Sequence, residues 1–261
     1  MKGTQFENNL NLFHVSFSYP EMQKLTLNDI SVSFKEGMMY VILGPNGCGK
    51  STLLKTACGI LRFRDGMIYL NGNEFPEYSR KELSKIIGIM EPEAPVPHGM
   101  TLRELLHICS DKTISPFWKG SDDVNKRMSE VCRLTETEQW LDLPLDRISS
   151  GQRQLCWLAA LIIQDTQYLL LDEPASFLDL KNQSKIIEIL KRLKTEYKKT
   201  VILVMHDIVL AQQCADEIIL MNEGQIVQQC ETLAKEQVEK IYGIQVNEIK
   251  LNNKKILLPF L

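Results

Sequence analysis

The sequence lacks any apolar run long enough to cross a membrane. Its longest unbroken run, residues 155–163, is about half the length that a membrane-spanning helix needs. The first stretch, residues 1–11, is polar and has no apolar core of a secretory signal. We therefore expect a cytoplasmic protein that reaches a membrane only through a partner.

Paired cysteines and an excess of one charge are also missing. The seven cysteines form no C-x-x-C pair and no cysteine–histidine metal spacing, which favours reduced core residues. Lysine plus arginine amounts to 30 and aspartate plus glutamate to 33, so the net charge is −3. This balance predicts no nucleic-acid partner. The 44% of hydrophobic residues is ordinary for a globular protein with a buried core.

What is present is the pattern of one α/β domain with an inserted subdomain, which fits 261 residues. Apolar and polar residues alternate over 10–19, 30–34 and 66–72, which predicts a half-exposed N-terminal antiparallel β subdomain. Residues 39–43 are continuously apolar and predict a strand buried on both faces.

Three later apolar runs, 168–171, 201–205 and 218–221, are separated by helical patterns, one of them over 186–197. Strands that alternate with helices predict parallel strands with crossover helices. The stretch 92–144 breaks this rhythm, because it opens with prolines and continues with helical patterns. It predicts an inserted α-helical subdomain with a semi-rigid, proline-rich entry. After a hairpin turn at 222–225, the tail predicts short strands and one helix near 233–241.

A phosphate-binding loop is the clearest motif. The pattern G-x-x-x-x-G-K-[ST] is matched by Gly44, Pro45, Asn46, Gly47, Cys48, Gly49, Lys50 and Ser51. The alternative is a glycine-rich turn before an unrelated helix. The predicted buried strand before the motif and the helix pattern after it favour the phosphate-binding loop. Such a loop wraps phosphates with backbone N–H groups, so its glycines supply small size and positive φ. Lys50 would reach the β and γ oxygens, and Ser51 would ligate Mg²⁺.

An acidic pair follows the apolar run 168–171. That strand would deliver Asp172 to its carboxyl end beside the phosphate loop, where the carboxylate can hold Mg²⁺ through its water shell. Glu173 comes one residue later and can polarise the attacking water. An acidic pair is by itself often a solvated strand end, and the loop upstream is what favours a catalytic role.

Taken in order, these motifs resemble those of the ABC-type ATPases, and the resemblance covers nearly the whole chain. Residues 148–152 (ISSGQ) resemble the LSGGQ signature, and residues 176–179 (SFLD) resemble the SALD segment that crosses the dimer interface. The two matches include Ser149, Ser150, Gly151, Gln152 and Asp179. Tyr19 stands where the family stacks an aromatic ring on adenine, and His206 stands where the family has its switch histidine. Each alone has an ordinary structural explanation, as a helix cap, a packed aromatic or a core histidine.

This resemblance implies a P-loop NTPase fold, with a RecA-like core and mixed sheet. It implies ATP hydrolysis in a head-to-tail homodimer, because one chain carries one loop and one signature. Tyr19 would stack on adenine, the loop from Gly44 to Thr52 would hold the phosphates, and His206 would contact the γ-phosphate. The signature, at a helix N-terminus, would bind the γ-phosphate held by the other subunit.

Two positions depart from the family pattern. Ser150 stands where the first signature glycine is usual, which is tolerable only if the backbone there needs no positive φ. Glu91 stands where the family has a glutamine that ligates Mg²⁺ and senses the membrane partner. Glutamate keeps an oxygen ligand and adds a negative charge, so we expect Mg²⁺ still to bind and hydrolysis or coupling to change.

The resemblance also implies an assembly. We expect a single domain over 1–261, with a nucleotide-binding core at 9–91 and 148–222, a helical insert at 92–147 and a C-terminal extension at 223–261. The expected partners are a second copy, an integral membrane permease at the inner face of the cell membrane and, indirectly, an extracytoplasmic substrate-binding protein. The features are similar to those of importers for iron-siderophore complexes, haem or cobalamin. A soluble ABC ATPase of the iron–sulfur assembly type is the alternative.

Overall fold

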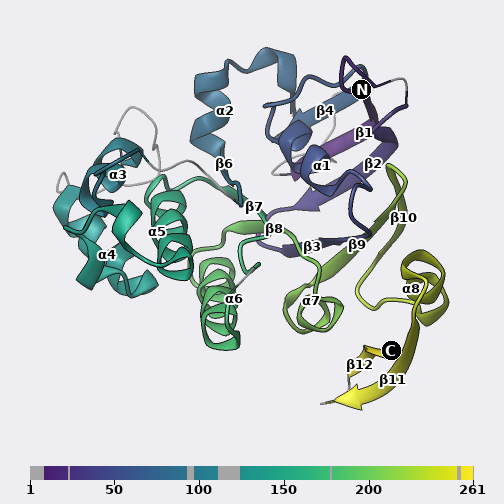
Figure 1. Ribbon diagram of the computed structural model, residues 1–261. Coiled ribbons are helices and arrows are strands. Elements are labelled where there is room, and N and C mark those ends of the chain that lie inside the picture. The colour runs from purple at the N-terminus through teal and green to yellow at the C-terminus, as the bar shows by residue number, and fades with distance from the viewer. Residues whose placement is uncertain are drawn as a thin grey trace. The chain divides into compact units, whose positions relative to one another are not determined.

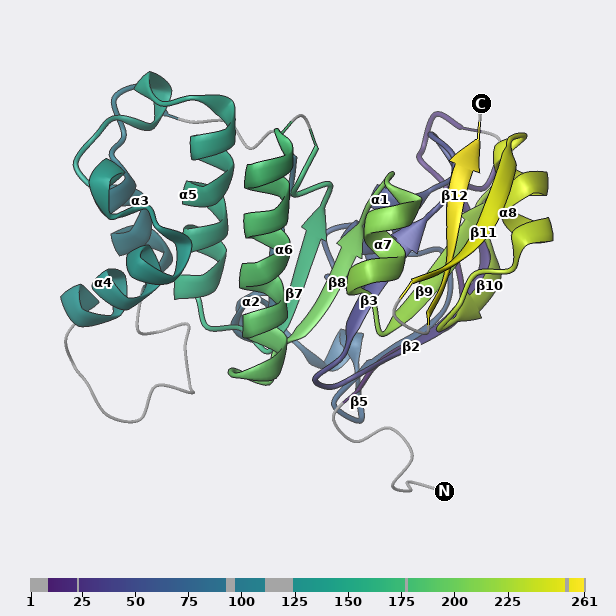
Figure 2. The same ribbon diagram turned by 90° about the horizontal axis from the view of Figure 1, so that it is seen from below.

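The computed structural model describes residues 9–22, 24–92, 97–110, 124–176, 178–251 and 254–260 (Figures 1 and 2). The contacts divide the chain into two compact units. The first contains Met1–Tyr78 and Thr200–Leu261, and the second contains Ser79–Lys199. The division into core, insert and extension expected from the sequence stays a prediction.

The first unit begins with the expected antiparallel sheet. It consists of β1 (Asn9–Phe17), β2 (Leu27–Lys35), β4 (Asp65–Leu70) and β5 (Asn73–Glu74) in the order β2-β1-β4-β5. A short 3-10 helix, η1 (Phe75–Glu77), follows it. Apolar side chains of alternate residues are buried on one face, as the period of two predicts.

The parallel strands of the first unit hold the phosphate loop. β10 (Gln225–Cys230), β9 (Glu217–Asn222), β3 (Met39–Leu43) and β8 (Thr200–Val204) are neighbours in that order. β3 runs parallel to β8 and β9, and β10 returns antiparallel to β9 after the expected hairpin turn. Every residue of β3 and β8 is buried, which is why these strands are apolar without alternation.

Helices and a hairpin complete the first unit: α1 (Lys50–Ala57), α7 (Ile208–Cys214), α8 (Lys235–Tyr242), β11 (Gln245–Leu251) and β12 (Lys254–Phe260). β11 and β12 form an antiparallel pair, and β12 lies beside α7 (Figure 2). The buried side chain of Gln212 donates to the Leu257 carbonyl at 3.1 Å and accepts from the Leu257 amide at 2.9 Å. This pair of bonds attaches the C-terminal hairpin to α7.

The second unit is mainly helical. Its strands β6 (Ile87–Met90) and β7 (Tyr168–Asp172) pair in parallel. Its helices are α2 (Arg80–Ile86), α3 (Leu102–Cys109), α4 (Val124–Thr135), α5 (Ser150–Ile163) and α6 (Leu180–Thr195), with short 3-10 helices η2 (Glu138–Trp140) and η3 (Leu145–Arg147). α3, α4 and α5 pack around one apolar cluster, and α3 and α4 are helices within the stretch where the sequence predicts helical patterns (Figure 1).

One helix boundary differs from expectation. The apolar pattern over 186–197 predicted a helix that includes Tyr197 on its apolar face, but α6 ends at Thr195 and Tyr197 is 51% exposed. Lys198 adopts the left-handed conformation with φ 55°, and the Lys199 amide donates to the Leu193 carbonyl at 3.1 Å. Such a bond ends a helix even where the apolar pattern continues.

All seven cysteines are free thiols, and four of them are buried. No helix within the described ranges is both long and apolar enough to cross a membrane.

Candidate functional site

The backbone of the phosphate loop has the positive φ values that its glycines predict. φ is 154° at Gly44, 76° at Gly47 and 106° at Gly49. A Cβ at Gly44 would come within 2.3 Å of the Met221 carbonyl oxygen, and one at Gly49 within 2.8 Å of the Thr26 carbonyl oxygen. Only glycine therefore fits at the two ends of the loop, where its backbone lies against neighbouring backbone.

Lys50 lies inside the loop. Its ammonium group is buried and donates to the carbonyl oxygens of Gly44 at 2.8 Å and Pro45 at 3.0 Å. Gly49 is the N-cap of α1. The first amides of the helix, including those of Ser51 and Thr52, therefore have no carbonyl acceptor within the helix. A helix N-terminus with a lysine beside it is suited to bind phosphate oxygens.

The thiol of Cys48, also in the loop, is buried. Burial raises the pKa of this thiol, and Lys50 only partly opposes the shift. Because the thiolate is the reactive form, these surroundings favour a packing role over reactivity.

Tyr19 and His206 both lie near the loop. The hydroxyl oxygen of Tyr19 is 3.3 Å from that of Thr52, and the Tyr19 ring packs edge-on against Phe17 at 4.9 Å. β3 and β8 are parallel with Ile42 opposite Val204, so His206 follows β8 at the edge where the loop follows β3. The first unit thus brings the expected adenine contact and switch residue to the phosphate loop.

Acidic residues end both strands of the second unit. Met90 is opposite Leu171 in the parallel pair, so Glu91 and Asp172 follow at the same level of neighbouring strands. Asp172 is buried, whereas Glu91 and Glu173 are half-buried. Glu173 adopts φ 52°, and its carboxylate accepts a hydrogen bond from the Ser176 hydroxyl at 2.9 Å. Carboxylate oxygens at adjacent strand ends are a suitable donor set for Mg²⁺.

The signature residues form an exposed helix N-terminus. Ser149 caps α5 by accepting from the Gln152 amide at 3.3 Å, and the Gln152 side chain accepts from the Ser149 amide at 3.0 Å. Ser150 is the first helical residue and is absent from the positions of positive φ. The backbone at Ser150 therefore needs no positive φ, so serine is tolerated in place of the usual glycine. Ser149 and Ser150 are exposed, so an anion from outside can reach this end of the helix.

Asp179 starts the next helix. Its side chain accepts from the Asn182 amide at 2.8 Å and caps α6. A Cβ on Gly151 would lie 3.1 Å from the Leu178 side chain, so the signature and the segment before α6 are in contact. Phe177 of the SFLD segment lies outside the described residues.

The predicted residues fall into two groups. Tyr19, the loop from Gly44 to Thr52 and His206 belong to the first unit, whereas Glu91, the signature, Asp172, Glu173 and Asp179 belong to the second. In the first unit Tyr19 contacts the loop, and in the second the signature contacts the segment before α6.

Tyr242 is a neighbour of the loop that the motif search missed. Burial raises the pKa of its hydroxyl to about 12, and the Gly44 backbone, which lowers it in part, lies near enough to do so. Tyr242 ends α8 in the C-terminal extension. No sequence signal could have indicated this contact, because nearly two hundred positions separate the two residues along the chain.

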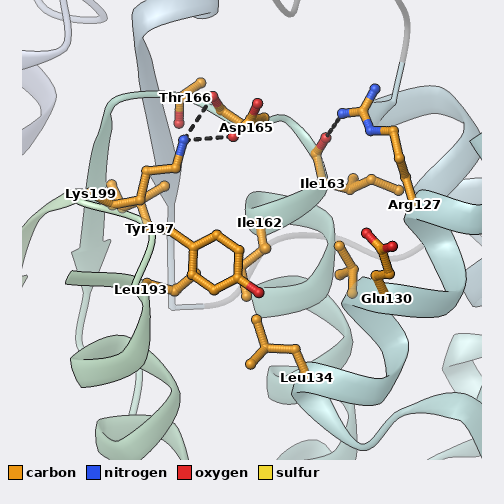
Figure 3. A pocket seen from close by; sticks show the side chains of 12 residues that line it. Arg127, Glu130, Leu134, Ile162, Ile163, Asp165, Thr166, Leu193, Tyr197 and Lys199 are labelled. Carbon is orange, nitrogen blue, oxygen red and sulfur yellow. Dashed lines mark hydrogen bonds and ion pairs between the residues drawn. The ribbon is translucent and has the colours of Figure 1, made fainter. Parts of the chain in front are cut away.

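A small cavity in the second unit contains none of the predicted residues. It has a volume of about 40 Å³ and lies between α4 and the C-terminal ends of α5 and α6 (Figure 3). Lys199 donates to the Asp165 carboxylate at 2.6 Å, and Arg127 donates to the Ile163 carbonyl oxygen at 2.8 Å. Glu130, Thr166, the Tyr197 ring and aliphatic side chains form the rest of the wall. Lys199 and Arg127 bond to partners within the second unit, so we interpret the cavity as a packing defect of that unit.

The sequence matches a family model and several known proteins. A model of the ABC transporter family matches residues 27–176. The iron(3+)-hydroxamate import ATP-binding protein FhuC of Bacillus subtilis is 32% identical over 206 residues, which is 79% of this chain and 77% of the relative. The petrobactin import ATP-binding protein YclP of Bacillus subtilis is 31% identical over 91% of this chain and 94% of the relative.

A solved structure has the same fold. It is the dimeric structure of the ATP-binding cassette MJ0796 in a post-hydrolysis state, bound to ADP and Pi. The TM-score is 0.75 with 25% identity, and the match covers 86% of this chain and 100% of that chain. The P-loop NTPase fold expected from the sequence is therefore confirmed.

Proposed function

The chain belongs to the ABC transporter family, and on that premise we propose that it drives import of an iron(III)–siderophore complex through a separate membrane permease. It is an ATP-binding subunit and hydrolyses ATP. The cargo class is supported by the relatives named for hydroxamate and petrobactin import. Haem and cobalamin remain the other members of the expected cargo group.

The observation that carries this function is the geometry of the phosphate loop. Its glycines have positive φ, Gly44 and Gly49 lie against neighbouring backbone, and the Lys50 ammonium lies inside the loop at the start of α1. A backbone cradle, a helix N-terminus and a buried cation converge on one point, which is the arrangement that triphosphates require. With ATP bound, Lys50 would exchange its carbonyl partners for phosphate oxygens.

We assign the remaining roles as the family resemblance implies them. Tyr19 stacks on adenine, and the loop from Gly44 to Thr52 holds the phosphates. Glu173 accepts a proton from the attacking water, and His206 contacts the γ-phosphate. Most of the rate comes from positioning and from charge stabilisation, because phosphoryl transfer needs little covalent help from the protein.

Mg²⁺ would be held by Ser51, Asp172 and Glu91. The donor set fits this ion, since it offers a hydroxyl and two carboxylates and no sulfur or imidazole. When bound, Mg²⁺ neutralises charge that develops on the β and γ oxygens. Glu91 adds a negative charge to this set.

The catalytic assembly is a head-to-tail homodimer. The exposed N-terminus of α5 supplies Ser149, Ser150 and Gly151 to the γ-phosphate of the partner chain, and Gln152 and Asp179 complete that edge. The dimeric cassette with a similar fold supports this arrangement. One chain carries one loop and one signature, so two chains complete two sites.

The permease would dock on the second unit. An open groove there is lined by Pro97, His98, Gly99, Met100, Glu104, His107 and Ile108. Ile108 is 61% exposed, and a permease helix that covers it would bury its apolar side chain. Through the permease the protein would sit peripherally at the inner membrane face and work with an extracytoplasmic substrate-binding protein. A soluble assembly ATPase has no support among the importer relatives described above.

The test uses the variant Glu173→Gln, which removes the proposed base and keeps the side-chain volume. With MgATP it should form a stable dimer in light scattering after gel filtration, while phosphate release falls at least about a hundredfold. Glu196→Gln, at an exposed residue of the same unit, is the matched control and should behave as wild type. A monomer that persists at saturating MgATP, or unchanged phosphate release, would contradict these roles. A multi-span permease recovered from solubilised membranes with the wild-type chain would support the transporter assignment, and recovery of soluble assembly factors alone would contradict it.

A further inference from the structure

The turn after β7 holds Glu173 by both its backbone and its side chain. Glu173 has φ 52°, a left-handed conformation that is unfavourable for a residue with a Cβ. The Ser176 amide donates to the Glu173 carbonyl oxygen at 3.2 Å, and the Ser176 hydroxyl donates to Glu173 Oε2 at 2.9 Å. One residue therefore bonds to the main chain and to the carboxylate of the proposed base.

This turn is itself attached to α6. The Gln183 side chain donates to the Ala175 carbonyl oxygen at 3.3 Å. Gln183 lies in the first turn of α6, which Asp179 caps. The turn is thereby anchored to the helix whose start contacts the signature through Leu178. The position of Ser176 is determined by structure on both sides of it.

We propose that Ser176 is a positioning residue that sets the orientation of the Glu173 carboxylate for proton transfer. The inference rests on the proposed role of Glu173 as the base. In hydrolysis the water oxygen forms the new bond to the γ-phosphorus, the bond from the γ-phosphorus to the bridging oxygen breaks, and the water proton passes to the carboxylate. A carboxylate has two oxygens, so a hydroxyl can hold one while the other faces the water.

The hydroxyl matters because a glutamate side chain has several rotatable bonds. Without the Ser176 hydrogen bond, the carboxylate would spend more time in orientations that do not face the water, and the rate would fall as the population of the productive orientation falls. Binding of ATP depends on the loop and not on this carboxylate. Loss of the hydroxyl should therefore lower kcat and leave KM for ATP unchanged.

The experiment compares Ser176→Ala, Ser176→Cys and Ser176→Thr in the full-length chain with its permease. Ala and Cys should lower kcat about tenfold with KM for ATP within about twofold, because one lacks the donor and the other offers a weak one. Thr retains a hydroxyl and should restore kcat to within about threefold of wild type. Ser129→Ala removes a hydroxyl that bonds only within α4, to the Asn125 carbonyl oxygen, and serves as the matched control with unchanged kcat.

A second measurement needs no hydrolysis. In protein labelled with ¹³C at the glutamate carboxylates, the resonance lost in Glu173→Gln identifies Glu173, and it should move in Ser176→Ala but not in Ser129→Ala. In the Glu173→Gln background, Ser176→Ala should cause no further loss of rate, since the two residues act as one unit. An unmoved resonance, a normal kcat in Ser176→Ala, or an equal loss in both backgrounds would overturn the inference. Absence of phosphate release by wild type would overturn the proposed function instead, while the resonance would still decide the role of Ser176.

Discussion

Substituting glycines of the phosphate loop by alanine should separate backbone strain from steric overlap. Gly47 has φ 76° and has no atom within 4 Å of a Cβ built on it. Gly49 has φ 106°, and its Cβ would lie 2.8 Å from the Thr26 carbonyl oxygen and 3.1 Å from the Leu27 side chain. The two positions lie in the same loop and differ in whether a methyl group has room.

The expected magnitudes follow from these contacts. Gly47→Ala adds only left-handed strain, about 1 kcal/mol. Gly49→Ala adds strain of about 1–3 kcal/mol and overlap of about 1–3 kcal/mol, so its cost is about 2–6 kcal/mol. The overlap cannot relax cheaply, because the Thr26 amide donates to the Phe17 carbonyl oxygen at 2.8 Å and fixes the backbone there.

The assay is the free energy of unfolding from urea titration of the nucleotide-free protein. Thermal unfolding gives a second reading: Gly47→Ala should lower Tm by about 2–4 °C, and Gly49→Ala by at least about twice as much. Equal destabilisation by the two substitutions would refute the steric reasoning. Greater destabilisation by Gly47→Ala would also refute the loop conformation on which the proposed ATP site depends.

Two further predictions concern carboxylates. Glu91→Gln removes an anionic ligand, so the Mg²⁺ concentration that gives half-maximal ATP hydrolysis should rise by about a few fold. An identical Mg²⁺ dependence and identical rates would contradict a role for Glu91. Hydrogen bonds from the Thr101 amide and hydroxyl lower the pKa of Glu104 from its ordinary 4.5. Folding thus favours the ionised carboxylate. Its contribution to the free energy of unfolding is complete above pH 4.5 and is lost as the pH falls through the lowered pKa. The difference in unfolding free energy between wild type and Glu104→Gln should accordingly shrink below pH 4.5 in urea titrations, and a constant difference would contradict it.

Local physical chemistry made much of the fold and the conformation of several motifs predictable. A strand buried on both faces must be apolar throughout, so 39–43 and 201–205 were identifiable as β3 and β8. The loop between β3 and α1 needs glycine at fixed offsets, and the positive φ values at Gly44 and Gly49 agree with that need. Ser149 and Gln152 form a capping box whose spacing is visible in the sequence.

Other features depended on contacts between residues distant in the chain. The pairing of β6 with β7 placed Glu91 level with Asp172, and no local pattern specifies which strands become neighbours. The end of α6 was misjudged because an apolar period does not report where a left-handed residue stops the helix. The approach of Tyr242 to the loop and the bond from Ser176 to Glu173 depend on where whole elements and side chains pack. The sequence determined the chemistry of each motif, because that depends on residue type and short spacing. Tertiary structure alone decided which groups contact the Glu173 carboxylate, because such contacts depend on side chains meeting in space.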